Sequence, residues 1–342
     1  MTRRGFVKGA VGVAGAGWVM HAAQSGWAQT SAQNHALERN KALALRFKKA
    51  QGAPDQDAVM KAVLAPNYKR VRGGMHHLAA NAEGQGFPGS GAFLRGAFPD
   101  RVDIIEEVIA EGDRVGLLFR LTGTHQGNLF GIAPTGKKVD VYESAILRIA
   151  NNQIVEGWFM ADEAGLLKQL GAGLPPRKDG KRIVPPVSGA GEDPNAVLKR
   201  LETGALVTRE DRNRLMVARS KGAAPPAGDR TADYKQLRQG FQHLRNYGVA
   251  KGVAAETPTR ALPDRRDLID GFMAEGDTVW MQFKIAGTQT VKLYGHPPTG
   301  NRIEAEEIGI LKFQDGKWKS GWYFGDELAL MLQLDALHML QS

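Results

Sequence analysis

Two acidic residues, Asp162 and Asp326, follow similar aromatic segments and are candidates for acid/base chemistry. Alternate residues of an extended strand share one face. Each carboxyl group would therefore end a largely aromatic and apolar stripe, which consists of Glu156, Trp158 and Met160 before Asp162 and of Ser320, Trp322 and Phe324 before Asp326. Because an apolar pocket raises the pKa of a carboxyl group, such a group could take a proton from an acidic carbon and return it. The residues also allow each Asp simply to cap the Ala- and Leu-rich segment that follows it.

Four further polar residues are candidates to line the same pockets. Glu143 and Glu307 stand at matching places in the preceding strands and could face the same cavities as the Asp residues. Two carboxyl groups in one cavity would repel each other, so that one pKa would be raised above the other. The alternative for both is a strand residue that faces solvent. His77 and His243 could each orient a carbonyl group or relay a proton, or could be structural.

The remaining histidines give no metal site. His125 is a candidate pocket residue, but Gln289 occupies the matching position, which indicates a polar role that either side chain can fill. His76 and His77 lack companion ligands at the spacing of a metal site, and the sequence contains no cysteine. We therefore predict neither a metal nor another cofactor.

The candidates occur in pairs because the sequence contains an internal duplication. Several motifs recur at a constant offset of 164: Pro99-Asp100-Arg101 and Pro263-Asp264-Arg265, Gly112-Asp113 and Gly276-Asp277, Pro134-Thr135-Gly136 and Pro298-Thr299-Gly300, Gly157-Trp158 and Gly321-Trp322. Nearer the N-terminus the offset is 166, as for Tyr68 and Tyr234. Chance does not keep one spacing through so many positions, so the sequence predicts two copies of one domain.

Each copy has the pattern of an α+β domain. In the first, helical spacing at residues 36–49 precedes strand patterns at 114–122, 138–149 and 153–161 and a short closing helix at 164–170. With no parallel crossover expected, this order predicts a curved antiparallel sheet wrapped on helices. The predicted domains are residues 36–171 and 194–342, and the Pro- and Gly-rich residues 172–193 form a linker.

The composition is that of a globular protein, with 42% hydrophobic and 24% charged residues among 342. The net charge is +9, but both signs are interleaved, so we predict no nucleic-acid partner. No apolar stretch approaches the roughly 20 residues of a membrane span, which argues against an integral membrane protein. The motifs of phosphate-binding loops, dinucleotide sites and serine hydrolases are absent from the sequence.

The N-terminal segment, residues 1–28, has the pattern of an export signal. Arg3 and Arg4 are followed by Phe6 and Lys8 and then by a charge-free run at residues 9–20 that is too short to span a bilayer. This pattern resembles a twin-arginine signal peptide with cleavage near Ala28. The resemblance implies a protein that folds in the cytoplasm and is delivered to the periplasm.

The order of the motifs resembles the SnoaL-like polyketide cyclase family, also called ester cyclases. The first copy carries the resemblance at residues 97–100, 110–115, 121–125, 131–136, 156–158 and 162–171. The second carries it at residues 262–264, 274–277, 295–300 and 322–334, but Ser320 replaces Glu156 and Gln289 replaces His125.

This resemblance implies the nuclear transport factor 2-like fold, a cone of curved sheet and helices around one deep pocket. In characterised relatives the pocket holds a polyketide ester, which an intramolecular aldol reaction closes into a ring without metal or organic cofactor. The acid/base residue of those relatives is the Asp at the end of the final strand. By that likeness it is Asp162 in the first copy and Asp326 in the second.

We therefore predict a periplasmic protein whose two domains each enclose a pocket for a hydrophobic carbonyl compound. Cyclase or related acid/base chemistry is favoured in the first domain. The alternative is a non-catalytic protein that binds a small apolar ligand in the same pockets. A further hypothesis is that the two domains pack on each other as an intramolecular pseudo-dimer, which would replace the homodimer that single-domain relatives often form.

Overall fold

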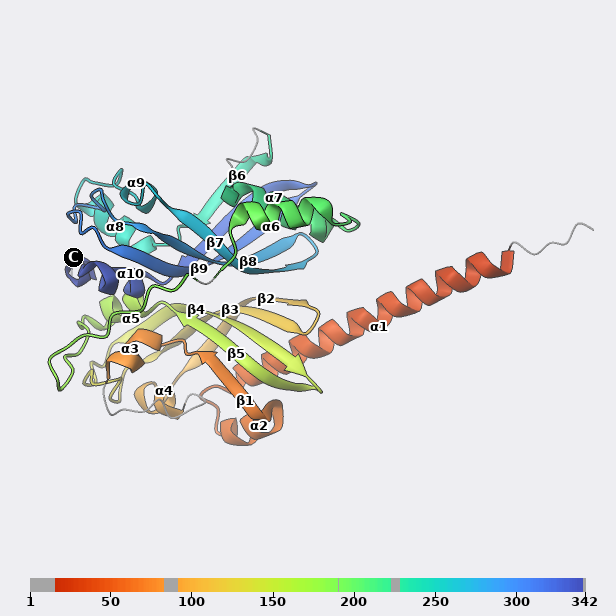
Figure 1. Ribbon diagram of the computed structural model, residues 1–342. Helices are drawn as coiled ribbons and strands as arrows, with labels where there is room; N and C mark the ends of the chain where they lie inside the picture. The colour runs from red at the N-terminus through yellow and green to blue at the C-terminus, as the bar shows by residue number, and fades with distance from the viewer. Residues whose placement is uncertain (1–15, 83–91, 190, 223–227, 341–342) are drawn as a thin grey trace, which may run out of the picture.

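The computed structural model describes residues 16–82, 92–189, 191–222 and 228–340, with side chains from residue 33 onward. It shows two tandem domains of the same design, each built on a five-stranded sheet (Figure 1). The α+β class and the duplication are therefore confirmed. The twin-arginine motif at residues 2–8 lies outside the described residues.

The first domain carries strands β1 to β5. In chain order it contains α1 (Ala16–Lys49), α2 (Gln56–Val63), β1 (Leu64–Arg72), α3 (His76–Asn81), α4 (Ala92–Ala97), β2 (Val102–Glu111), β3 (Arg114–Thr124), β4 (Lys138–Ala150), β5 (Gln153–Ala161) and α5 (Glu163–Leu170). The strand order in its sheet is β1-β5-β4-β3-β2.

The second domain repeats this arrangement with strands β6 to β10. It contains α6 (Pro194–Thr203), α7 (Arg209–Gly222), β6 (Arg230–Arg238), α8 (Gln242–Ala250), α9 (Pro258–Ala261), β7 (Arg266–Glu275), β8 (Thr278–Thr288), β9 (Arg302–Gln314), β10 (Lys317–Gly325), α10 (Glu327–Leu334) and the short helix η1 (Leu337–Leu340). The strand order is β6-β10-β9-β8-β7.

Tight turns connect the long strands at matching places. Between β4 and β5, Asn151 and Asn152 have φ angles of 52° and 58°. Between β9 and β10, Asp315 and Gly316 have φ angles of 50° and 72°. Two-residue turns with positive φ match the right-handed twist of antiparallel strands, and Asn, Asp and Gly are the residues that tolerate them. The local sequence therefore fixes both hairpins.

The sheets are mixed, whereas the sequence predicted an antiparallel sheet without a parallel crossover. The strands predicted at 114–122, 138–149 and 153–161 are present as β3, β4 and β5. The edge strand β1, however, runs parallel to β5, with Arg70 opposite Gly157, and β6 likewise runs parallel to β10. In β1 only Ala65 and Arg72 are buried, so the strand lacks the apolar alternation by which strands are recognised in sequence.

Each sheet has helices on one face and the other domain on the opposite face (Figure 1). Strand β3 shows the alternation: Leu117 and Phe119 lie in the core with α1 and α2, while Leu118 lies in the cluster between the two sheets. Trp280 and Phe324 of the second domain belong to this inter-sheet cluster. The contact is therefore a shared apolar core, which removes large side chains of both domains from water.

Reciprocal polar contacts join the edges of the two sheets. The carboxyl group of Glu275 accepts a hydrogen bond from the backbone nitrogen of Ala110 at 2.9 Å. Glu111 accepts one from the backbone nitrogen of Ala274, also at 2.9 Å. Each domain therefore makes the same hydrogen bond to the other.

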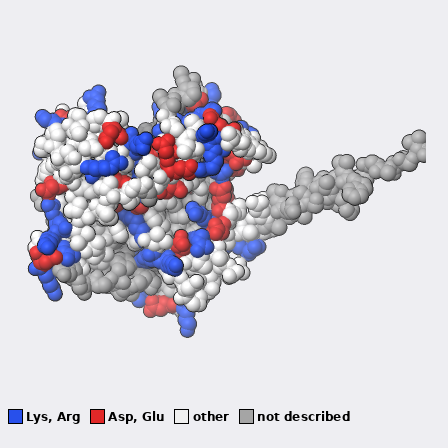
Figure 2. Space-filling view, in the orientation of Figure 1, with Lys and Arg blue, Asp and Glu red and all other residues white. Residues whose placement is uncertain are grey.

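Charges of both signs are spread over the surface. Figure 2 shows Lys and Arg next to Asp and Glu over the face in view. Among the described residues, no helix combines the length and apolar character needed to cross a membrane.

Candidate functional site

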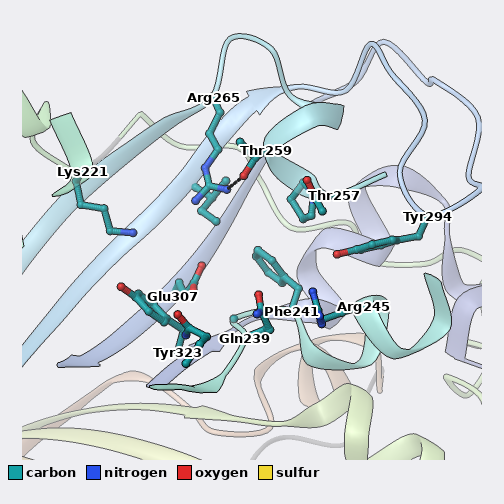
Figure 3. A pocket seen from close by; sticks show the side chains of 14 residues that line it. Lys221, Gln239, Phe241, Arg245, Thr257, Thr259, Arg265, Tyr294, Glu307 and Tyr323 are labelled. Carbon is teal, nitrogen blue, oxygen red and sulfur yellow. Dashed lines mark hydrogen bonds between the residues drawn. The ribbon is translucent and has the colours of Figure 1, made fainter. Parts of the chain in front are cut away.

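A cavity lies inside the second domain, between the helix-covered face of its sheet and helices α7, α8 and α9 (Figure 3). Its volume is about 330 Å³, which is within the range of small-molecule sites. Most of the residues that line it are polar or charged: Lys221, Gln236, Gln239, Arg245, Thr257, Thr259, Arg265, Tyr294, Glu307 and Tyr323. The lining therefore differs from the aromatic and apolar one that the sequence suggested.

Two cations in the cavity wall share one largely buried carboxylate, that of Asp267 on β7. Lys221 Nζ lies 2.8 Å from Asp267 Oδ2. Arg265 donates from Nε and Nη2 to the two carboxylate oxygens at 2.7 and 3.1 Å. Burial alone would raise the pKa of Asp267, but the charges of Lys221 and Arg265 outweigh it and lower that pKa to about 2. Asp267 is therefore ionised and holds both cations in place.

Glu307 on β9 is the acidic group of the cavity. Its side chain is only 5% exposed, and within the described residues its carboxyl group has no hydrogen bond or ion pair. Burial raises its pKa to about 7, although the charges of Lys221 and Arg265 oppose the rise. A carboxyl group whose pKa lies near neutrality can both accept and return a proton there. The sequence predicts Glu307 as a pocket residue, and the structure places it in the cavity.

Two neighbours define the surroundings of Glu307. A Cβ atom at Gly240 would lie 2.0 Å from Glu307 Oε1, so the carboxyl group occupies the space that a side chain there would need. Tyr323 on β10 also lines the cavity. Burial and the charge of Glu307 raise the pKa of Tyr323, so its hydroxyl group stays protonated and is a hydrogen-bond donor.

The first domain repeats this group of charges. Lys48 Nζ lies 2.8 Å from Asp103, and Arg101 donates two hydrogen bonds to Asp103 at 2.8 and 2.9 Å. Glu143 lies 4.0 Å from Arg101. A Cβ atom at Gly74 would lie 2.1 Å from Glu143 Oε1, as at Gly240 in the second domain. Glu143 is thus the counterpart of Glu307 and is buried, not exposed to solvent.

Asp162 lies at the contact between the domains. Its Oδ1 atom accepts a hydrogen bond from the backbone nitrogen of Gly165 at 2.8 Å and so caps helix α5. Its Oδ2 atom lies 2.8 Å from Nε2 of His243 and 3.6 Å from Arg238, both in the second domain. Asp162 therefore has the capping role that the sequence allowed, together with an ion pair across the interface.

Asp326 makes the reciprocal contacts. It caps helix α10 by accepting a hydrogen bond from the backbone nitrogen of Ala329 at 3.0 Å. Its Oδ2 atom lies 2.7 Å from Nε2 of His77 and pairs with Arg72, both in the first domain. The structure thus brings His77 together with Asp326 and His243 together with Asp162, each across the domain boundary.

The electrostatics of these pairs keep the carboxyl groups ionised. Burial would raise the pKa of Asp162, but the hydrogen bond and charge of His243 outweigh it and lower the pKa. The charges of His77 and Arg72 have the same effect on the pKa of Asp326. Burial lowers the pKa of both histidines, and their Asp partners more than reverse this. A carboxylate whose pKa is lowered in this way is a weak proton acceptor.

The aromatic stripe next to these Asp residues also lies between the domains. Its members are buried or partly buried in the inter-sheet cluster: Trp158, Met160, Trp322 and Phe324. The ring of Trp322 meets that of Tyr142 edge to face, with 5.3 Å between the centroids. These side chains lie on the same face of the strand as the Asp residues, as predicted. That face, however, forms the contact between the domains and not the wall of the cavity. The carboxyl groups of Glu143 and Asp162 therefore do not share a pocket.

His125 stabilises a turn. Its Nδ1 atom accepts a hydrogen bond from the backbone nitrogen of Thr135 at 3.2 Å. In the second domain, Oε1 of Gln289 accepts one from the backbone nitrogen of Thr299 at 2.6 Å. The two side chains hold the same Pro-Thr-Gly turn, as expected from a polar role that either residue can fill.

Sequence reasoning missed the cations and the carboxylate that surround Glu143 and Glu307. Asp103 and Asp267 are related by the offset of 164, so the duplication could have identified them. Lys48 and Lys221 fall outside both offsets, so only the fold brings them to matching places. Among the residues that the structure describes, no three His, Asp or Glu side chains come together as a metal site requires.

Comparison with known proteins identifies one family. The sequence profile described as SnoaL-like polyketide cyclase matches residues 86–170 and 235–334, together more than half of the chain. Among curated protein sequences, none matches significantly.

Several solved structures are similar to one domain of the chain. A protein assigned as a SnoaL-like polyketide cyclase from Jannaschia sp. CCS1 is 26% identical over 41% of this chain and 95% of its own, with a TM-score of 0.33. AclR from Streptomyces galilaeus, assigned as a hydroxylase, is 27% identical over 40% of this chain and 82% of its own, with a TM-score of 0.33. IdmH from Streptomyces antibioticus, assigned as a polyketide cyclase, is 22% identical over 39% of this chain and 99% of its own, also with a TM-score of 0.33.

Proposed function

Because the chain belongs to the SnoaL-like polyketide cyclase family, we propose that its second domain is an acid/base catalyst that acts on a small carbonyl compound. The observation that carries this proposal is the position of Glu307: a buried carboxyl group with a pKa raised to about 7 that lines a cavity of about 330 Å³. A catalytic acid/base group works best when its pKa is near the working pH.

The proposed reaction is proton transfer at carbon, followed by ring closure. The carboxylate of Glu307 takes a proton from a carbon next to a carbonyl group, and the electron pair of that C–H bond moves onto the carbonyl oxygen. The hydroxyl group of Tyr323 and the positive charge of Lys221 stabilise the resulting enolate. The enolate carbon then bonds to a second carbonyl carbon of the same molecule, whose oxygen receives the proton from Glu307. No atom is lost and no oxidant is consumed.

The geometry favours Glu307 over Asp162 and Asp326 for this role. Both Asp residues are hydrogen-bonded to a helix N-terminus and paired with a histidine of the other domain. Their lowered pKa values make them weaker bases than Glu307. We therefore propose that the acid/base residue of this chain lies one strand away from the position that the family resemblance implies.

Exchange of carbon-bound hydrogen for deuterium tests the proposal without knowledge of the substrate. The probe is methyl 4-oxopentanoate in D₂O, whose ketone activates the neighbouring C–H bonds, and exchange is followed by proton NMR. We expect the wild-type protein to accelerate exchange and Glu307→Gln to lose about 100-fold or more of that acceleration, the usual contribution of a general base. Asp162→Asn should keep the wild-type rate per folded molecule.

Two results would contradict this assignment. If Asp162→Asn abolished exchange in folded protein while Glu307→Gln did not, the acid/base residue would be Asp162. If the wild-type protein bound the probe without accelerating exchange, the alternative of a non-catalytic binding protein would be favoured.

We also propose that the protein is exported in folded form by the twin-arginine route. The support is the sequence pattern at Arg3 and Arg4. In bacterial cells that carry this machinery, the full chain should appear in the periplasmic fraction and lose an N-terminal segment that ends near Ala28. Replacement of both arginines by lysine should retain it in the cytoplasm, and periplasmic recovery of that variant would refute the route.

A further inference from the structure

We propose that the cavity of the second domain takes an organic anion, a carbonyl compound that also bears a carboxylate group, and that Arg245 binds this carboxylate. The inference rests on the proposed function, because it names the substrate class of the same site. Three observations support it: the charge balance of the cavity, the differences between the two domains, and the position of Arg245 relative to Glu307.

The charge balance leaves Arg245 without a counter-ion. Among the residues that line the cavity, the cations are Lys221, Arg245 and Arg265. Lys221 and Arg265 are held by Asp267. The half-buried side chain of Arg245 has no ion pair or side-chain hydrogen bond within the part of the chain that the structure describes. A guanidinium group in a cavity favours a planar anion, which it can bind through two parallel hydrogen bonds.

At three lining positions of the cavity the first domain has an apolar residue where the second has a polar one. Arg245 on α8 corresponds to Ala79 on α3, by the offset of 166 that also relates His243 to His77. Tyr294 corresponds to Phe130 by the offset of 164, and the two have nearly the same backbone angle, φ of 49° and 50°. The backbone position is therefore kept, and the difference between the domains is a hydroxyl group.

The third difference between the domains is at Tyr323, which lines the cavity together with Glu307. Tyr323 corresponds to Phe159 by the offset of 164. Both rings lie near the matching ammonium group: Lys221 Nζ is 5.3 Å from the centroid of Tyr323, and Lys48 Nζ is 6.0 Å from that of Phe159. All three exchanges add a polar group to residues that line the cavity of the second domain. Three changes of the same kind at one cavity favour a polar ligand there. At a fourth lining position Gln236 stands where the first domain has Arg70, which removes a charge but keeps a polar side chain.

The cavity separates the anion-binding group from the acid/base group. Figure 3 shows Arg245 and Tyr294 on one side of the cavity, and Lys221, Arg265, Glu307 and Tyr323 on the other. A ligand whose carboxylate meets Arg245 therefore extends its other end toward Glu307. The carboxylate fixes the orientation of the ligand, and the carbonyl end is the part exposed to proton transfer.

A matched pair of probes tests the inference. We would titrate the full chain with 4-oxopentanoate and, separately, with its methyl ester, which differs by one negative charge, and measure both dissociation constants by ligand-observed NMR at about pH 8, where the acid is ionised. We expect the wild-type protein to bind the acid at least about tenfold more tightly than the ester, and Arg245→Gln to remove this preference. Tyr294→Phe should reduce it several-fold.

A control variant separates local binding from net charge. Arg212→Gln removes the same charge at an exposed position of α7 that does not line the cavity, and it should keep the wild-type preference for the acid. Equal affinity for acid and ester, no binding of the acid by the wild-type protein, or a preference that survives in Arg245→Gln would each overturn the inference.

The failure of this inference is distinguishable from failure of the proposed function. Glu307→Gln should abolish exchange yet keep the preference for the acid, because Arg245 is unchanged. If exchange depends on Glu307 but acid and ester bind equally, only the substrate class is wrong. If the acid is preferred but Glu307→Gln exchanges at the wild-type rate, the cavity binds an organic anion and the acid/base role of Glu307 is wrong.

Discussion

Nε2 of His243 in the second domain lies 2.8 Å from Oδ2 of Asp162 in the first, and the reciprocal pair of His77 and Asp326 is 2.7 Å apart. Each domain therefore supplies the carboxylate that pairs with a histidine of the other, where His77 is buried and His243 is half-buried. The ends of the final strands, β5 and β10, serve the domain contact, while the carboxyl groups of Glu143 and Glu307 face the interior of their own domains.

Asp326→Asn should destabilise the protein by about 3–5 kcal/mol, because it removes the buried carboxylate that pairs with both His77 and Arg72 and leaves Arg72 paired with Glu306. Asn is as good a helix cap as Asp, so the substitution tests the ion pair rather than the cap. Urea denaturation followed by circular dichroism measures the free energy of unfolding. Asp233→Asn is the control, since it breaks an exposed pair with Lys319 that should contribute only about 0–1 kcal/mol. Equal losses of stability in the two variants would contradict the stabilising role of the buried ion pairs of Asp326.

The stability that the His–Asp pairs contribute should decrease as the pH rises. The folded-state pKa of His77 and of His243 is raised by the Asp partner, against the effect of burial. This contribution is therefore complete below the ordinary histidine value of about 6.5 and is lost as the pH rises through the folded-state value. The difference in unfolding free energy between wild type and the double variant His77→Gln/His243→Gln should shrink between about pH 6 and pH 9. A difference independent of pH would show that the two histidines have the same pKa in the folded and the unfolded protein.

Glu307→Gln should likewise gain stability relative to the wild type as the pH rises. The folded-state pKa of about 7 lies above the ordinary value of 4.5, so the folded protein binds the proton more strongly than the unfolded chain. Wild-type stability is therefore lost between these two values as the pH rises, by up to about 3 kcal/mol, and a glutamine avoids the loss. Unfolding free energies measured at about pH 4.5 and pH 8 should show the variant gaining on the wild type at the higher pH. No relative gain would mean that Glu307 ionises normally.

Gly240→Ala should displace the carboxyl group of Glu307, because the added Cβ atom would lie 2.0 Å from Oε1. We expect a loss of about 1–3 kcal/mol of stability, as for other overpacked sites, and a loss of Glu307-dependent exchange. Gly173→Ala is the matched control, since nothing lies within 4 Å of the Cβ atom that it adds. Wild-type exchange in Gly240→Ala would show that the position of this carboxyl group does not matter for activity.

The sequence predicted the repeated architecture well because periodicity and turn chemistry are local. The hairpin at Asn151 and Asn152 and the alternation of β3 both follow from short stretches of residues. Strand β1 escaped prediction because it pairs with β5, which is far from it in the sequence, and because it has no apolar pattern of its own.

The candidate site was predicted only in part, for a similar reason. Alternation along β5 correctly placed Trp158 and Met160 beside Asp162, but alternation cannot tell which of the two faces of a sheet meets a second domain. Glu307 was found because the duplication repeats Glu143. The roles of Arg245 and Lys221 depend on helices that cover the sheet, and neither helix position follows from the strand pattern.

The crossed pairs of Asp162 with His243 and of Asp326 with His77 constrain how the two halves of the gene can evolve. A substitution at one of these four positions removes the partner of a charged side chain in the other domain. Both members of a pair must therefore change together. The cone interiors make no such demand on each other. The cavity lining of one domain can therefore change to bind a new ligand while the lining of the other domain stays the same. The contact between the domains is retained in either case.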